Sequence, residues 1–398
     1  MSRPHLLFLC HRIPYPPNKG DKIRSWHLLR YLQGHYRVHL GAFVDDPADW
    51  VHREFLAEGC ESLYLRPLNP RTARLRSLQG LFDGRPLTLA YYRDRGMAAW
   101  VRGTLARRPV ETVFVFSSAM AQYVPEAAPI RHRVIDFVDV DSDKWRQYAA
   151  RLPWYSAWVY RREARRLEAF DKAVARAFDL SLLVSAQEAD LFRGLFGDDP
   201  PAIEALVNGV DTDFFAPDPL RPSPYPPGER AVVFTGAMDY WPNVDAVVWF
   251  AREIWPRICA ACPECRFHIL GGRPTETVRA LVDARIRVQG AVPDMRPWLQ
   301  GAAVVVAPMR IARGIQNKVL EGMAMARPVV TTAKGLEGIA ARPRREILVA
   351  DSADGFAAAV LEALGEGGEA LGRRAREYVC RQHTWEANLA ALGRFLQR

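Results

Sequence analysis

A basic, glycine-containing loop that runs into a helix-forming segment at residues 310–321 is the part of the sequence best suited to chemistry. Arg310, Arg313 and Lys318 place three cations around Gly314, and Glu321 follows Lys318 by three positions. A helix that begins here has free backbone N–H groups, so the segment suits an anion such as phosphate. Arginine forks bind phosphate oxygens, and a carboxylate accepts hydrogen bonds from a ribose diol. The alternative is a solvated basic loop that caps a surface helix.

A second candidate group lies near the N-terminus. Lys19, Gly20 and Asp21 lie between a Pro-rich loop and a helical pattern, where a glycine lets a phosphate or an acceptor approach the backbone. A plain tight turn explains the same residues. His11 directly follows the first predicted strand and is either a proton shuttle or a loop histidine whose hydrogen bonds are satisfied.

Four aspartates, at 136, 139, 141 and 143, form an acidic run around the end of another predicted strand. Such a group of oxygen ligands suits a cation such as Mg²⁺. The family resemblance described below favours instead a role in orienting a substrate or capping a helix, with Asp139 and Asp141 as the candidates. Asp139 and His11 are the two catalytic candidates, and no metal site is predicted.

These residues are positioned by a repeated strand, loop and helix pattern. In the first half, short apolar runs separated by helix-length stretches occur at 6–10, 38–43, 62–65, 112–116, 134–138 and 180–184. The first helix is expected to bury Ile23, Trp26, Leu29 and Leu32 on one face. Alternation of this kind predicts βαβ units and a parallel sheet.

A Pro-rich segment at 216–230 separates two such halves and predicts a linker. After it, strands are expected at 231–235, 267–270, 286–289, 303–307, 328–331 and 347–349, with helices at 244–259, 295–300 and 314–326. The predicted lobes are 1–215 and 231–380. The remaining 381–398 hold a helix that either stays with the second lobe or crosses back to the first. Two doubly wound α/β lobes predict a ligand-binding cleft between them.

Length and composition agree with two soluble lobes. The chain has 398 residues, of which 49% are hydrophobic and 25% charged, and no apolar run is long enough to span a membrane. No secretory leader is recognised, so the default location is the cytoplasm. Neither a G-x-G-x-x-G nor a G-x-x-x-x-G-K-[ST] motif follows a predicted strand, which argues against a dinucleotide dehydrogenase and a P-loop NTPase.

The six cysteines are too scattered for a disulfide scaffold. Cys259, Cys262 and Cys265, with His268, are spaced as in some metal sites, but Pro263 interrupts the run. Buried or incidental thiols are the preferred interpretation.

The net charge of +9 is concentrated in part in one stretch, because residues 144–176 hold nine basic and three acidic side chains. Within 145–166, six aromatic residues at 145, 148, 154, 155, 158 and 160 are followed by four arginines at 161, 162, 165 and 166. Three explanations remain open: contact with an anionic bilayer, a solvated helix with aromatics packed beneath it, or single-stranded nucleic acid. No nucleic-acid-binding module is found elsewhere, so no nucleic acid is expected as a partner.

Several motifs together resemble one family. Residues 318–332 (KVLEGMAMARPVVTT) are similar to the nucleotide-sugar motif of family-4 (group 1) retaining glycosyltransferases of the GT-B fold, which has two Rossmann-like lobes. Residues 208–215, 234–236 and 290–299 are similar to further landmarks of that family. Together with residues 11–26, 136–145 and 241–245, the pattern resembles sugar transferases of bacterial exosortase and exopolysaccharide loci.

Two departures from the family pattern bear on the site. The family has two glutamates separated by seven residues; Glu321 matches the second, but Arg313 stands at the first. The family's Arg and Lys after the first strand of the second lobe are also absent from residues 237–243. The first change affects recognition of the transferred sugar. The second suggests that Arg310, Arg313 and Lys318 meet the diphosphate charge.

The resemblance implies a metal-independent, cofactor-free transferase. A nucleoside-diphosphate sugar would bind at Gly20, Arg310, Arg313, Gly314, Lys318 and Glu321. A saccharide or polyprenyl-linked acceptor would lie near Lys19, Asp21 and Asp141, at the inner face of the cytoplasmic membrane if 145–166 contact lipid. A sugar-nucleotide epimerase on the same fold and a catalytically silent sugar-nucleotide-binding protein are the alternatives.

Overall fold

The computed structural model describes residues 3–81, 84–312 and 314–396, and the chain divides into two compact units. The first unit comprises Met1–Val207 and the chain from Leu389 on, and the second is Asn208–Asn388. The boundary therefore precedes the Pro-rich segment 216–230, which lies inside the second unit. Tyr225 of that segment is buried, contacts the His268 and Trp298 rings, and donates a hydrogen bond to the Trp298 carbonyl (2.8 Å).

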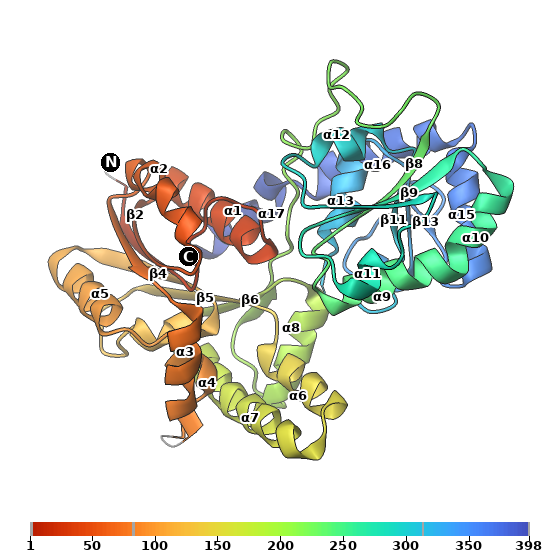
Figure 1. The fold of residues 1–398 in the computed structure, drawn as a ribbon. Coiled ribbons are helices and arrows are strands. Elements are labelled where there is room, and N and C mark those ends of the chain that lie inside the picture. The colour runs from red at the N-terminus through yellow and green to blue at the C-terminus, as the bar shows by residue number, and fades with distance from the viewer. Residues whose placement is uncertain (1–2, 82–83, 313, 397–398) are drawn as a thin grey trace. The chain divides into compact units, whose positions relative to one another are not determined.

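The first unit is built on a parallel sheet with the strand order β3-β2-β1-β4-β5-β6-β7 (Figure 1). Its strands are β1 (His5–Cys10), β2 (Arg37–Val44), β3 (Ser62–Pro67), β4 (Val110–Phe116), β5 (His132–Val138), β6 (Leu180–Leu183) and β7 (Ile203–Ala205). The order changes direction between β1 and β4. That switch point is where ligands bind to open α/β sheets, beyond the carboxyl ends of the strands.

Helices cover both faces of this sheet (Figure 1). They are α1 (Gly20–His35), α2 (Arg53–Glu58), α3 (Pro70–Ser77), α4 (Leu87–Tyr91), α5 (Arg95–Arg107), α6 (Asp141–Arg151), α7 (Trp154–Ala177) and α8 (Ala186–Arg193), with 3₁₀ turns η1 (Pro47–His52), η2 (Leu78–Leu81), η3 (Ser118–Tyr123) and η4 (Gly194–Phe196). The last helix, α17 (Trp385–Leu396), ends in this unit, where Gly393 contacts Tyr31 of α1.

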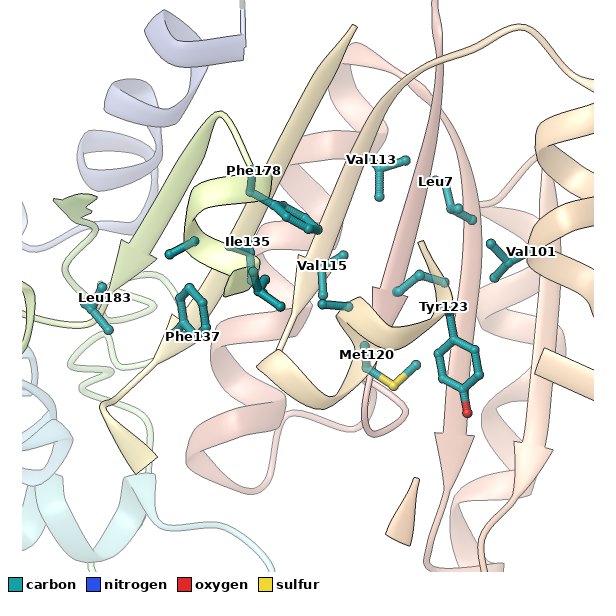
Figure 2. Packing of buried hydrophobic residues seen from close by; sticks show 14 of the residues in the cluster. Leu7, Val101, Val113, Val115, Met120, Tyr123, Ile135, Phe137, Phe178 and Leu183 are labelled. Atoms are coloured by element: carbon teal, nitrogen blue, oxygen red, sulfur yellow. The ribbon is translucent and has the colours of Figure 1, made fainter. Parts of the chain in front are cut away.

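Alternation along the strands divides their side chains between the two faces. Leu7 of β1 belongs to the cluster that packs under α5, α7 and α8 (Figure 2), and so does Leu9. Leu6 and Phe8, which alternate with them, are buried on the opposite face. Because both faces are covered, the strands are nearly continuous hydrophobic runs, and this is why their positions were predictable from sequence.

The buried face of α1 differs from the predicted one. Leu29 and Leu32 are buried as expected, but Ile23 and Trp26 are only partly buried, and Lys22 and Arg24 are almost completely buried instead. Each cation has a buried acidic partner: Lys22 Nζ lies 2.5 Å from Asp49 Oδ2, and Arg24 Nε lies 2.7 Å from Asp136 Oδ2. Paired in this way, the charges are tolerated at positions that apolar periodicity cannot identify.

The second unit is built on another parallel sheet, with the order β10-β9-β8-β11-β12-β13 (Figure 1). Its strands are β8 (Arg230–Thr235), β9 (Cys265–Leu270), β10 (Ile286–Gly290), β11 (Val304–Ala307), β12 (Val329–Thr331) and β13 (Leu348–Val349). Here the switch point lies between β8 and β11. The doubly wound α/β prediction is confirmed in both units.

The helices of the second unit are α9 (Trp241–Trp249), α10 (Trp255–Ala261), α11 (Glu276–Arg279), α12 (Arg296–Gly301), α13 (Asn317–Ala324), α14 (Ala333–Leu336), α15 (Ala353–Leu364) and α16 (Gly368–Gln382). The predicted helix 244–259 is α9 and α10 joined by a π-helical turn, η5 (Phe250–Ile254). The helix predicted at 314–326 corresponds to α13, which is shorter at both ends. Before it, Gly314 has a left-handed φ of 62° that a helix does not allow.

The cysteine interpretation needs a correction. Cys262 and Cys265 are joined by a disulfide across the turn from α10 to β9, where their Cα atoms lie 5.6 Å apart. His268 instead contacts Glu229, with Nε2 2.7 Å from Oε1. Among the described residues, no group of three or more His, Cys, Asp and Glu side chains is arranged to hold a metal ion.

Candidate functional site

The loop after β11 and the helix α13 form the candidate site of the second unit. Thr331 and Thr332, at the end of β12, fix the start of this loop by donating hydrogen bonds to the carbonyls of Ala307 (2.9 Å) and Met309 (2.6 Å). The helix packs closely on the sheet because Gly322 has no side chain: a Cβ there would lie 3.0 Å from Val305. The amino end of α13 is thereby held at the switch point between β8 and β11.

Lys318 and Glu321 of α13 are the predicted residues that this arrangement brings together. Lys318 Nζ donates to Gln316 Oε1 (3.2 Å) and lies 5.4 Å from the ring centre of Phe234 on β8. Burial lowers the pKa of Lys318 to about 8, although the charge of Glu321 opposes this effect. Burial likewise raises the pKa of Glu321 to about 7, opposed by Lys318. Both charged forms are thus poorly solvated, as is common at binding sites.

Two other predicted members of the site are placed differently. Arg310 uses its guanidinium fork on Asp245 of α9, with Nε–Oδ2 and Nη2–Oδ1 distances of 3.0 and 2.6 Å. Its Cζ also lies 5.4 Å from the ring centre of Trp249. Arg310 is therefore paired with α9 in this structure and does not join Lys318 in one phosphate-binding group. Arg313 lies outside the described residues.

Bare glycine backbone beside α13 was missed by sequence reasoning. Gly236 and Gly271 directly follow β8 and β9, with φ values of 157° and 151°. A Cβ on Gly271 would lie 1.6 Å from the Gly236 carbonyl oxygen, so no side chain fits. A glycine after each of two neighbouring strands is the sequence signal that would have identified this edge. Its effect is to let the two turns and the Asn243 side chain pack closely at this edge of the sheet, since a Cβ on Gly236 would lie 2.6 Å from Asn243 Nδ2.

The candidate site of the first unit is centred on His11, at the carboxyl end of β1. The His11 ring stacks on Phe116, the last residue of β4, with ring centres 5.7 Å apart. This contact places His11 at the switch point between β1 and β4. Its Nε2 lies 3.3 Å from Asp21 Oδ2, and its Nδ1 is buried without a hydrogen-bond partner in the described part of the chain.

Charges around His11 are extensively paired. Arg12 contacts Asp21 through Nη1 and Asp45 through Nε, the latter at 3.0 Å. Burial alone would raise the pKa of the Asp21 carboxyl, but the hydrogen bond and charge of His11 and the charge of Arg12 hold that pKa well below its usual range. Asp21 is therefore ionised at neutral pH.

Lys19 and Gly20 lie at the start of α1, beside this pair. Lys19 has the extended conformation of an N-cap residue (φ −138°, ψ 153°), and its side chain makes no capping bond. A Cβ on Gly20 would meet no atom within 4 Å. The start of α1 is therefore open, which leaves both predicted roles, a ligand-approach loop and a plain turn, as predictions.

The acidic run is divided between two places. Asp136 is completely buried against Arg24 and accepts a hydrogen bond from the Val138 backbone N–H (3.0 Å). Asp139 and Asp141 share Lys144, at 2.7 and 3.0 Å. In the described residues, no contact joins Asp139 to His11, so the two catalytic candidates are not brought together. Asp141 is the first residue of α6, where the negative charge of a carboxylate interacts favourably with the positive end of the helix dipole.

Comparison with known proteins identifies the second unit. Residues 229–366, which carry α13, Gly236 and Gly271, match the family model described as glycosyl transferases group 1. The second unit contains a group 1 glycosyltransferase domain. The enzyme class predicted from the sequence, a glycosyltransferase, is confirmed by this domain. No match is found among curated proteins.

Solved structures share the fold of the whole chain. Alr3699/HepE from Anabaena, in complex with UDP and glucose, superposes with a TM-score of 0.69 at 13% identity, covering 99% of this chain and 100% of that one. Sucrose-phosphate synthase from Thermosynechococcus elongatus gives 0.69 at 16%, with 99% and 98% covered. WaaG, a glycosyltransferase involved in lipopolysaccharide biosynthesis, gives 0.64 at 16%, with 97% and 98% covered. The predicted GT-B fold is confirmed.

Proposed function

We propose that the chain is a retaining glycosyltransferase that transfers a sugar from a nucleoside-diphosphate sugar to a saccharide or lipid-linked acceptor in exopolysaccharide assembly. The observation that carries the proposal is the placement of Lys318 and Glu321 at the start of α13, at the switch point of the group 1 domain. An ammonium and a helix amino end suit a diphosphate, and the carboxylate suits a ribose diol.

The proposed reaction needs no nucleophile from the protein. The bond between the anomeric carbon and the diphosphate oxygen breaks, the acceptor hydroxyl attacks the same face, and a leaving diphosphate oxygen takes the hydroxyl proton. Lys318 and the N–H groups at the start of α13 stabilise the charge on the departing diphosphate. We assign no proton transfer to Asp139, because Lys144 pairs with its carboxylate. His11 stays a candidate proton shuttle.

The first experiment measures nucleotide affinity. UDP and UDP-glucose are the first probes, because the structural neighbour HepE was solved in complexes with both. Lys318→Ala should weaken UDP binding about 10- to 100-fold, the cost of a lost charge-assisted hydrogen bond. Lys334→Ala is the matched control, because Lys334 is an exposed lysine of the same unit that pairs with Glu337. Equal UDP affinity in both variants would reject the diphosphate site.

Turnover then separates the three classes of function. A transferase releases the nucleoside diphosphate and does so faster with an acceptor present. An epimerase converts the sugar nucleotide without releasing it. A silent binding protein shows affinity and no product. Nucleotide release that Glu321→Gln leaves unchanged would contradict the ribose-binding role.

We also propose that the α6–α7 hairpin contacts an anionic membrane surface. Trp154, Trp158 and Tyr148 are 81%, 50% and 40% exposed. Arg161 and Arg165 line a cavity of about 730 Å³ beside them. Exposed aromatics beside arginines suit the headgroup region of a bilayer. No described helix is both long and apolar enough to cross one.

Vesicle co-sedimentation tests the membrane contact. Binding to phosphatidylglycerol vesicles should exceed binding to phosphatidylcholine vesicles and should fall at least about tenfold in Trp154→Ala/Trp158→Ala. Leu220→Ala, which removes an apolar side chain that is 91% exposed in the second unit, is the control. A wild-type protein that prefers a single-stranded oligonucleotide to both vesicles would overturn the proposal in favour of nucleic acid.

A further inference from the structure

A cavity of about 570 Å³ lies at the carboxyl ends of β2 and β3 in the first unit. Asp45, which follows β2, lines it together with Trp50 of η1. Arg71, in the first turn of α3, and Arg74, in its last turn, also line it. Ligands of parallel α/β sheets bind beyond this edge of the strands. Trp50, Arg71 and Arg74 belong to neither site described above. Asp45 is linked to the first site by its contact with Arg12.

Asp45 has one satisfied and one unsatisfied carboxylate oxygen. Oδ2 accepts a hydrogen bond from Arg12 Nε (3.0 Å), whereas Oδ1 is buried and has no hydrogen-bond partner in the described part of the chain. A buried acceptor without a donor costs about 1–3 kcal/mol, more when the group is charged. A ligand hydroxyl would remove this cost by donating to Oδ1 once the carboxyl group turns that oxygen toward the cavity. The cavity therefore favours a ligand rich in O–H groups.

The walls of the cavity are apolar and rigid. Trp50 is partly buried, and Pro47, Pro67 and Pro70 also line the cavity. An aromatic ring offers a flat apolar surface of large area. Hydroxyl groups around an apolar ring face are the chemistry of a sugar, which would stack its C–H face on Trp50 while its hydroxyls reach Asp45.

The rim of the cavity carries two cations. Arg71 and Arg74 are exposed, and neither side chain has an ion-pair or hydrogen-bond partner in the described part of the chain. They are three residues apart on α3 and so lie on one face of that helix. Asn69 fixes the start of α3 by accepting from the backbone N–H groups of Arg71 (2.9 Å) and Thr72 (3.4 Å). The guanidinium groups of two such neighbouring arginines match a carboxylate or a phosphate.

The cavity is connected to His11 by a chain of contacts. Asp45 pairs with Arg12, Arg12 pairs with Asp21, and Asp21 Oδ2 lies 3.3 Å from His11 Nε2. A ligand in the cavity would thus be connected to the switch point of the first unit through the ion pairs of Arg12 and Asp21.

We propose that this cavity binds the acceptor as a saccharide that carries a carboxylate or a phosphate. Its hydroxyls donate to Asp45, its ring stacks on Trp50, and its anionic group pairs with Arg71 and Arg74. The proposal rests on the function proposed above and names the acceptor class for it.

Ligand-observed NMR on the full chain tests the proposal with glucuronate, glucose 6-phosphate, glucose and inorganic phosphate as probes. At least one anionic sugar should bind ten times more tightly than glucose and than inorganic phosphate. The glucuronate and glucose 6-phosphate arms distinguish the carboxylate from the phosphate. Equal binding of glucose and both anionic sugars would overturn the anionic class, and phosphate binding as tight as glucose 6-phosphate would overturn the saccharide.

Variants locate the binding in the cavity. Asp45→Asn and Trp50→Ala should each weaken binding of the anionic sugar at least tenfold. Arg71→Ala/Arg74→Ala should abolish the preference over glucose. Asp46→Asn, the same change at an exposed neighbour outside the cavity, should bind as the wild type does. Wild-type binding in Asp45→Asn and Trp50→Ala would overturn the site.

UDP affinity, measured on the same samples, separates this proposal from the donor site. It should be unchanged in all these variants, which also shows that they are folded. If only Lys318→Ala loses UDP binding and all variants outside the cavity still bind the sugar, the cavity keeps its assignment as the acceptor site. If the wild type binds UDP but no sugar, the cavity proposal is rejected and the donor-site proposal stands.

Discussion

The two units place charged residues at the same point of similar sheets, but they satisfy the charges in opposite ways. At the switch point of the first unit, Asp21 contacts both His11 and Arg12, so its charge is balanced within the protein. At that of the second unit, Lys318 and Glu321 both have pKa values shifted toward their neutral forms by burial. The difference fits the proposal that a charged ligand completes the second site, whereas the charges at the first are already paired within the protein.

The largest expected effect is on the free energy of unfolding, and it comes from a glycine that directly follows a strand of the second unit. Gly271→Ala should lower the free energy of unfolding by more than about 3 kcal/mol, because the added Cβ overlaps the Gly236 carbonyl and φ is 151°. Gly20→Ala, at the start of α1, should change it by less than about 0.5 kcal/mol, since its Cβ meets open space. Urea unfolding of both variants measures the contrast, and similar losses would contradict it.

The next effect is a pH optimum for nucleotide binding. Glu321 must be ionised to accept two hydrogen bonds, and Lys318 must be protonated to neutralise phosphate, so affinity should be greatest between about pH 7 and 8. Affinity should fall up to about tenfold per pH unit on either side. Titration calorimetry with UDP from pH 5.5 to 9.5 measures this profile.

Two variants show which residue causes the loss of affinity on each side of that pH profile. Glu321→Gln should flatten the acid limb, because no carboxylate remains to be protonated. Lys318→Arg should remove the alkaline limb, because a guanidinium keeps its charge. A profile that keeps both limbs in both variants would show that other groups titrate.

A smaller effect is expected at Asp21, the ionised acid of the first site. Its folded pKa is depressed, so its contribution to stability is present above the unfolded pKa of about 4 and is lost as pH falls below that value. Asp21→Asn should reduce the free energy of unfolding by about 1–2 kcal/mol at pH 7, and the difference from wild type should shrink at pH 3. A difference that grows on acidification would contradict the pairing with His11 and Arg12.

The smallest effect is expected at Arg310. Its pair with Asp245 is at the surface, where such pairs contribute about 0–1 kcal/mol. Because its fork is occupied, Arg310→Ala should change UDP affinity by about twofold or less, in contrast to Lys318→Ala. A tenfold loss of UDP affinity would mean that Arg310 leaves Asp245 to bind the phosphate.

The sequence alone determined the parts of this protein that depend on local pattern. Apolar runs such as 6–10 and 303–307 predicted the buried strands, because a parallel sheet covered on both faces requires continuous apolar residues. The spacing of Lys318 and Glu321 predicted two side chains on neighbouring positions of one helix, because that relation depends only on the helical repeat.

The tertiary structure decided whatever depends on partners distant in the sequence. Arg310 and Lys318 are both cations in one loop and helix, yet Asp245, on another helix, pairs with the first, whereas burial lowers the pKa of the second to about 8. Lys22 and Arg24 are buried because Asp49 and Asp136 reach them from other elements. The buried oxygen of Asp45 has no sequence signature, since it depends on which donors the fold brings near. A sequence shows which groups are charged, and the fold determines which of them have partners.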